Sequence, residues 1–185
     1  MSMKEQTLPS IERAARRRFG SAMSRGLSTR LLIDQTTRLP NHFAFELFYQ
    51  RSHRLGRSLA VIELDIAGFG RFNERRGGLQ RGNELLANFA IALTQSIKST
   101  DFVARWSVGD EFVIAATGVT TTKALQRLCE RLEGPFVVKW GRRHRLLRCY
   151  TVGILTGGMR LEEVERVLHE RLRQKKVAAK RAGRS

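Results

Sequence analysis

Apolar residues along the chain repeat at two spacings, one typical of helices and the other typical of strands. Runs at helical spacing predict helices over residues 43–55, 84–98, 120–134 and 161–183. Short, nearly continuous apolar runs predict a central strand over 58–66, a hairpin over 101–117, and a second hairpin whose strands are 135–140 and 144–155. The glycine-rich stretch 67–83 is expected to form turns. This order predicts an α+β domain with a central, mainly antiparallel sheet covered by helices.

The first 30 residues are expected to form a basic helical extension that precedes a single domain over residues 31–185. Ser10 can serve as the N-cap of this helix. Its apolar residues recur every four positions, which advances about 40° per step and drifts off any single face. Two interpretations stay open, a simple lead-in helix or a basic amphipathic surface for a membrane or a partner.

Length and charge restrict the class of protein. A chain of 185 residues can form one well-packed domain, and its formal net charge of +17 indicates an anionic partner such as a nucleotide, a nucleic acid, an acidic protein or a membrane surface. Cys129 and Cys149 belong to no CxxC motif and are expected to be reduced core residues. The sequence has no apolar run of about 20 residues and no signal-peptide core at its start, so we expect a cytoplasmic protein without a transmembrane segment.

Three carboxylates occupy the ends of predicted strands. Asp65 ends the central strand, and Asp110 and Glu111 lie at the tip of the first hairpin. If these strands are neighbours, the side chains converge into a cradle for Mg²⁺, which prefers oxygen ligands and neutralises phosphate charge. Acidic residues also occur at strand ends and tight turns for solubility and local hydrogen bonding, and this alternative stays open.

Five separated motifs resemble those of the GGDEF domain, the catalytic module of diguanylate cyclases, which condense two GTP molecules into cyclic di-GMP. In chain order the matching stretches are DQTTRLPNH (34–42), LDIAGFGRFNE (64–74), GNELL (82–86), VGDEF (108–112) and AKRAGR (179–184). The resemblance implies a nucleotidyl-cyclase-like fold of the palm, ferredoxin-like type. It also implies a homodimer in which each domain holds one GTP for in-line transfer.

The resemblance assigns roles to the carboxylates. Asp65 and Asp110 would bind Mg²⁺ or Mn²⁺ as cofactor, assisted by the Ile66 carbonyl. Glu111 would lie beside the reacting 3′-hydroxyl as a candidate base. Asp110 and Glu111 are therefore the expected catalytic residues.

The resemblance also assigns the contacts to the nucleotide. Asn73 and Asn83 would contact the edge of the guanine base. Lys180 and Arg184 would bind the triphosphate, the first as a point charge and the second as a planar fork.

Two further pairs carry over from the family. Asp34 and Arg105 correspond to a pair that ties the N-terminal segment to the signature hairpin, so they are expected to be structural. Lys98 and Asp101 stand in the family's inhibitory R-x-x-D site, where a lysine cannot make the bidentate and stacked contacts of an arginine. This remnant of an inhibitory site has an alternative interpretation, in which the pair only ends a helix and begins a strand.

Several positions depart from the family pattern. Gly70 replaces a lysine near the phosphates, and Asn83 replaces an aspartate whose carboxylate can accept two hydrogen bonds from guanine. One extra residue separates Arg105 from Asp110, and Val108 replaces the first glycine of the signature. These changes predict a degenerate domain with weak or no cyclase activity.

Three classes of function follow from these observations. The first is a regulatory or protein-interaction module in cyclic di-GMP signalling, which docks on a phosphodiesterase or an effector. The second is an active diguanylate cyclase that binds GTP as a homodimer. The third is a nucleic-acid binder, which the charge of +17 suggests, although the sequence lacks the aromatic platform of RNA-binding sheets.

Overall fold

The computed structural model describes residues 29–76, 78–106 and 109–182. The predicted helical extension over residues 1–30 lies almost wholly outside these ranges, which begin with the 3₁₀ helix η1 (Thr29–Leu32). Among the described residues, no helix is both long enough and apolar enough to cross a membrane.

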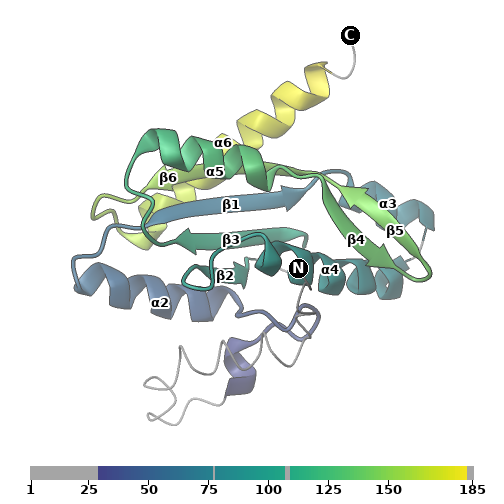
Figure 1. The fold of residues 1–185 in the computed structure, drawn as a ribbon, viewed down its shortest axis with the longest axis horizontal. Coiled ribbons are helices and arrows are strands. Elements are labelled where there is room, and N and C mark those ends of the chain that lie inside the picture. Colours follow the sequence, from purple (N-terminus) through teal and green to yellow (C-terminus); the bar gives the residue numbers. More distant parts are fainter. Residues whose placement is uncertain (1–28, 77, 107–108, 183–185) are drawn as a thin grey trace, which may run out of the picture.

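A central antiparallel sheet has the strand order β2-β3-β1-β6 (Figure 1). Its strands are β1 (Ala60–Ile66), β2 (Phe102–Arg105), β3 (Glu111–Ala116) and β6 (Cys149–Leu155). β1 lies inside the sheet and every one of its residues is buried, which explains its nearly continuous apolar run. The predicted fold class and the first hairpin are confirmed.

Helices cover both faces of this sheet. They are α2 (His42–Arg54), α4 (Gly78–Gln95), α5 (Thr122–Leu132) and α6 (Leu161–Ala182). Successive residues of β1 point to opposite faces. Val61 therefore packs in one core cluster with residues of α2 and α6, whereas Ile62 packs in a second cluster with residues of α4 and α5.

The glycine-rich stretch 67–83 is largely helical, so its prediction as turns was wrong. It holds α3 (Phe69–Arg76) and the first turns of α4, which begins at Gly78 instead of residue 84. Phe69 and Phe72 recur at helical spacing, and their ring centroids lie 6.3 Å apart in a stacked arrangement. Aromatic packing therefore outweighs the low helix propensity of the glycines.

The predicted return strand 144–155 consists of two strands in different sheets. β5 (Arg143–Leu147) pairs with β4 (Phe136–Trp140) in a separate hairpin, whereas β6 pairs with β1. The division falls at Arg148, whose carbonyl accepts a hydrogen bond of 2.9 Å from the Ala67 N–H. The β4–β5 hairpin lies at one end of the domain beside α3 and α4 (Figure 1).

Glu63 is a buried carboxyl in the middle of β1. It is 1% exposed, and its Oε1 lies 3.2 Å from His169 Nε2. That nitrogen accepts a hydrogen bond of 3.0 Å from the Trp106 indole N–H, so it has no proton to donate to Glu63. Burial, and after it the charge of Glu111, raises the pKa of Glu63 to about 8. The surroundings therefore favour a protonated Glu63 at neutral pH.

Phe89→Ala is expected to lower the free energy of unfolding by about 3–5 kcal/mol. Phe89 is fully buried, and its ring centroid lies 5.1 Å from those of both Phe112 and Phe136, so truncation leaves a cavity where α4 joins the two sheets. Urea denaturation measures the loss. The control Leu146→Ala, at a side chain 70% exposed, should cost less than about 1 kcal/mol. A similarly small loss for Phe89→Ala would contradict this packing.

Glu63→Gln is expected to stabilise the protein more as the pH rises. The folded carboxyl keeps its proton up to about pH 8 and the unfolded one releases it near 4.5, so the stability of the wild type falls across this interval, whereas an amide does not titrate. The gain in the free energy of unfolding should exceed about 1 kcal/mol at pH 8 and be much smaller near pH 5. Urea unfolding at both pH values measures it, with the exposed Glu162→Gln as control. Equal gains at the two pH values would show that Glu63 titrates normally.

Candidate functional site

β1 and β3 bring three acidic residues together at one end of the central sheet. Asp65 lies directly opposite Glu111 in the register of the two strands. The Ile66 N–H donates to the Asp110 carbonyl at 3.4 Å, so Asp110 lies beside the end of β1. The residues expected to bind metal and to take part in catalysis therefore occupy one small region.

Burial and mutual repulsion act on the pKa values of this cluster. Burial raises the pKa of Asp110 to about 6, and the negative charge of Asp65 acts in the same direction. Burial also raises the pKa of Asp65, although its hydrogen bond with Lys176 acts in the opposite direction. Carboxylates crowded in this way need a nearby cation if they are to stay ionised.

Lys176 supplies that cation. Its Nζ lies 2.5 Å from Asp65 Oδ2 and 4.0 Å from Glu111 Oε1. Sequence reasoning missed this residue. The available signal was its position four residues after the buried Leu172, which places a cation on the side of α6 that faces the sheet.

The arrangement does not fit the divalent metal that the family resemblance implies. Mg²⁺ requires carboxylate oxygens that face it directly. Here the Lys176 ammonium contacts Asp65 instead, so a side chain of the protein supplies the positive charge that a metal ion would otherwise supply.

The predicted guanine contacts lie in different surroundings. Asn73 lies in α3, and its buried Oδ1 has no hydrogen-bond partner among the described residues. It packs so closely against α4 that a Cβ at Gly82 would come within 2.2 Å of this oxygen. Asn83 lines a cavity of about 640 Å³ together with Arg105 and Trp106, and Asn73 does not belong to the described lining of that cavity.

The predicted phosphate-binding residues belong to the C-terminal end of the chain. Lys180 is exposed in the last turn of α6, and it forms no ion pair with an acidic residue that the structure describes. Figure 1 shows this end of α6 extending beyond the sheet. Arg184 lies outside the described residues. The lysine that contacts the acidic cluster is Lys176, which was not among the predicted phosphate-binding residues.

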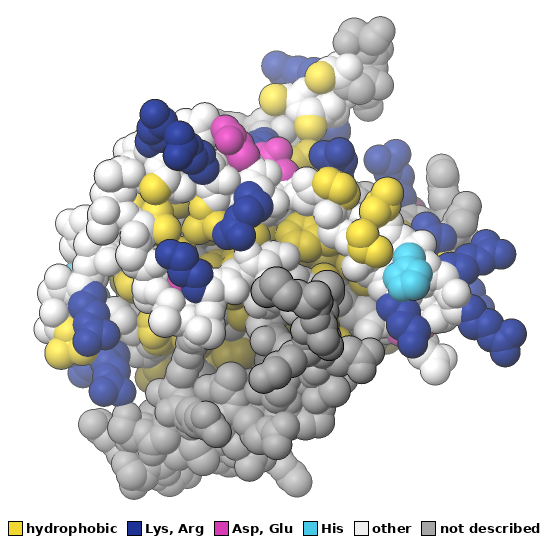
Figure 2. Space-filling model, in the orientation of Figure 1, with side chains coloured by type: hydrophobic (Ala, Val, Ile, Leu, Met, Phe, Trp, Pro, Cys, Tyr) yellow, Lys and Arg dark blue, Asp and Glu magenta, His cyan; other side chains and the backbone are white. Residues whose placement is uncertain are grey.

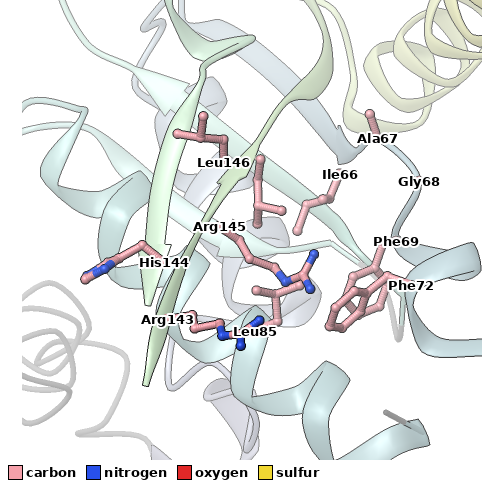
Figure 3. Close-up of a pocket in the computed structure, with 11 residues that line it drawn as sticks. Ile66, Ala67, Gly68, Phe69, Phe72, Leu85, Arg143, His144, Arg145 and Leu146 are labelled. Atoms are coloured by element: carbon pink, nitrogen blue, oxygen red, sulfur yellow. The ribbon is translucent and has the colours of Figure 1, made fainter. Parts of the chain in front are cut away.

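A cavity of about 560 Å³ borders the turn between β1 and α3. Figure 3 shows Arg145 of β5 pointing across it toward Phe72. The guanidinium carbon of Arg145 lies 5.3 Å from the Phe72 ring centroid and 4.5 Å from that of Trp140, which are cation–π distances. Arg143 also lines this cavity, and Figure 2 shows further Lys and Arg side chains spread over one face of the molecule, several of them on the right, where Figure 1 places the β4–β5 hairpin. The hairpin side of the domain therefore suits anionic groups.

Asp34 and Arg105 form an ion pair between the N-terminal segment and β2. Arg105 Nη1 donates to Asp34 Oδ1 at 3.0 Å, and Arg105 Nη2 donates to the Gly109 carbonyl at 2.7 Å. Arg105 is 5% exposed, so this largely buried guanidinium holds the start of the domain against the turn of the signature hairpin.

Asp101 makes local backbone contacts. Its Oδ2 accepts a hydrogen bond from the Lys98 backbone N–H at 3.0 Å, and its Oδ1 accepts one from the Thr117 N–H at 2.9 Å. The Lys98 residue is exposed. These contacts support the structural interpretation of this pair, in which Asp101 joins the start of β2 to the end of β3.

Comparisons with known proteins identify the family. The family model described as "Diguanylate cyclase, GGDEF domain" matches residues 31–185. Among solved structures, the GGDEF domain of YfiN from Pseudomonas aeruginosa is 23% identical, with a TM-score of 0.62, over 77% of this chain and 89% of that one. No curated protein matches the chain.

Two longer structures match over 95% of this chain. The diguanylate cyclase SiaD from P. aeruginosa, in complex with its activator SiaC, is 23% identical over 70% of its own length, with a TM-score of 0.61. The coiled coil and GGDEF domain of DgcB from Caulobacter crescentus, in complex with cyclic di-GMP, is 19% identical over 92% of its own length, with a TM-score of 0.64. These likenesses support the fold, and the family match over most of the sequence supports membership. The chain therefore belongs, through residues 31–185, to the GGDEF domain family of diguanylate cyclases.

Proposed function

We propose that this chain is a degenerate GGDEF domain that acts as a regulatory or protein-interaction module in cyclic di-GMP signalling, with weak or no cyclase activity. The observation that carries the proposal is the ion pair between Lys176 and Asp65. Transfer of a nucleotidyl group needs divalent cations that neutralise and orient the phosphates. A lysine ammonium carries one charge and cannot bridge phosphate oxygens as a metal ion does.

Changes at the nucleotide-contacting positions support this proposal. The amide of Asn83 cannot accept the two guanine hydrogen bonds that a carboxylate accepts, and Gly70 provides no cation for the phosphates. Each lost charge-assisted contact costs about 1.5–3 kcal/mol. Together with a lysine among the carboxylates, these losses favour a domain that binds GTP weakly.

A signalling protein is the partner that we propose for this module. The related cyclase SiaD forms a complex with its activator SiaC, which shows that a protein of this fold class can bind a regulatory protein. By analogy, this chain would bind a cyclic di-GMP phosphodiesterase or an effector in the cytoplasm. Its formal charge of +17 suits a partner with an acidic surface. In this proposal the basic segment 1–30 is an extension that precedes the GGDEF domain.

An active diguanylate cyclase is the second candidate. The adjacency of Asp65, Asp110 and Glu111 favours it, because these are the carboxylates that the reaction would need. It would require Mg²⁺ or Mn²⁺, GTP and a homodimer. A nucleic-acid binder has less support, because helices cover both faces of the central sheet, and the described residues of its strands form no exposed aromatic platform.

Incubation of the purified protein with GTP and Mg²⁺ or Mn²⁺ tests the proposed function. We expect no more cyclic di-GMP from the wild type than from Asp110→Ala, because Lys176 already neutralises Asp65, a carboxylate that would bind the metal. Chromatography of the nucleotides at high protein concentration provides the measurement. Product that forms with the wild type and disappears with Asp110→Ala would establish the active cyclase instead.

A further inference from the structure

The packing of α6 directs Lys176 at the acidic end of the sheet. Leu168 packs in the core cluster and Leu172 is also buried, so both lie on the side of this helix that faces the sheet and they define the rotation of the helix about its axis. Residues four positions apart lie one above the other on the same side of a helix. Lys176 therefore faces the sheet one turn beyond Leu172, and its place near Asp65 follows from the packing of the whole helix.

Lys176 acts on three acidic groups in this region. Its Nζ lies 2.5 Å from Asp65 Oδ2 and 4.0 Å from Glu111 Oε1. Its charge also opposes the rise in pKa that burial causes at Asp110. The Lys176 side chain is 31% exposed and that of Asp65 11%, so solvent screens this attraction less than it screens a surface pair. One ammonium group thus serves the cluster as a shared counter-ion.

The preceding lysine has a different partner. Lys175 Nζ contacts the Glu133 carboxylate and donates to the Thr151 carbonyl at 3.0 Å. Two lysines at successive positions therefore carry the same charge and contact different acidic residues. A change at Lys175 alters the net charge of the protein by the same amount but leaves the ion pair of Asp65 in place.

We propose that Lys176 is a tethered cation that takes the place of a divalent metal ion at Asp65 and Glu111, and that it lowers the affinity of this domain for Mg²⁺ and Mn²⁺. The inference rests on the proposed function, a domain with weak or no cyclase activity, and gives a physical cause for it. An incoming ion must either approach the ammonium against electrostatic repulsion or displace it from Asp65. Because the lysine is attached to a packed helix, its effective concentration at the carboxylates is high whatever the metal concentration.

Titration of the full chain with Mn²⁺, followed by the electron paramagnetic resonance signal of the free ion, tests this inference. Lys176→Met removes the charge and keeps a side chain of similar length, so we expect it to bind Mn²⁺ about tenfold tighter or more, a difference of about 1.4 kcal/mol. Lys175→Met is the matched control and should bind Mn²⁺ like the wild type. Equal Mn²⁺ affinities for the wild type and Lys176→Met would overturn the inference.

A second substitution locates the ion that the Lys176→Met variant gains. Adding Asp65→Asn should abolish the gain in affinity, because it removes the carboxylate that Lys176 contacts. A gain that persists in the double variant would place the ion elsewhere and would also overturn the inference. Circular dichroism checks that each variant is folded, and Lys176→Gln replaces the methionine variant in the same titration if that variant does not fold.

The Mn²⁺ titration and the cyclase assay test separate claims, so a result that contradicts one claim does not contradict the other. Cyclic di-GMP produced by the wild type would contradict the proposed function, whatever the variants show with Mn²⁺. Equal Mn²⁺ affinities without any product would overturn only the role given to Lys176, and the loss of activity would then have another cause, such as Asn83.

Discussion

The antiparallel pairing of β1 with β3 is the constraint on which the acidic cluster depends. It sets Asp65 opposite Glu111 and brings Asp110 within a backbone hydrogen bond of Ile66. The register is held by apolar side chains on both faces, among them the fully buried Phe112. A shift of one residue would turn every side chain of a strand to the opposite face, so the packing of the core also determines where the carboxylates lie.

The same pairing crowds negative charge into a partly buried region, and that charge has to be compensated. In the family this compensation is expected from a divalent metal, whereas here α6 provides Lys176. A lysine can neutralise a carboxylate but cannot orient phosphates as a metal ion does. In the proposed function, the fold of a cyclase persists in a form suited to contacts with other proteins, and its basic surface (Figure 2) favours acidic ones.

Much of this structure could be predicted because the patterns are local. The apolar run of β1 and the strands on either side of the first hairpin sufficed to predict the antiparallel sheet and the acidic cluster at its end. The prediction of turns over residues 67–83 was wrong because the stacking of Phe69 on Phe72 outweighs the low helix propensity of the glycines. The run 144–155 could not be divided correctly, because an apolar pattern does not show which sheet a strand joins. Lys176 was not predicted from the sequence, because its contact with Asp65 depends on how α6 packs on the sheet.

A crystal structure of the wild-type chain grown with saturating Mn²⁺ and GTP tests the central claim most directly. The account predicts that the Lys176 ammonium stays against Asp65 and that anomalous scattering shows no manganese at the carboxylates. A manganese ion bound to Asp65 and Asp110, with the Lys176 side chain turned away, would contradict it.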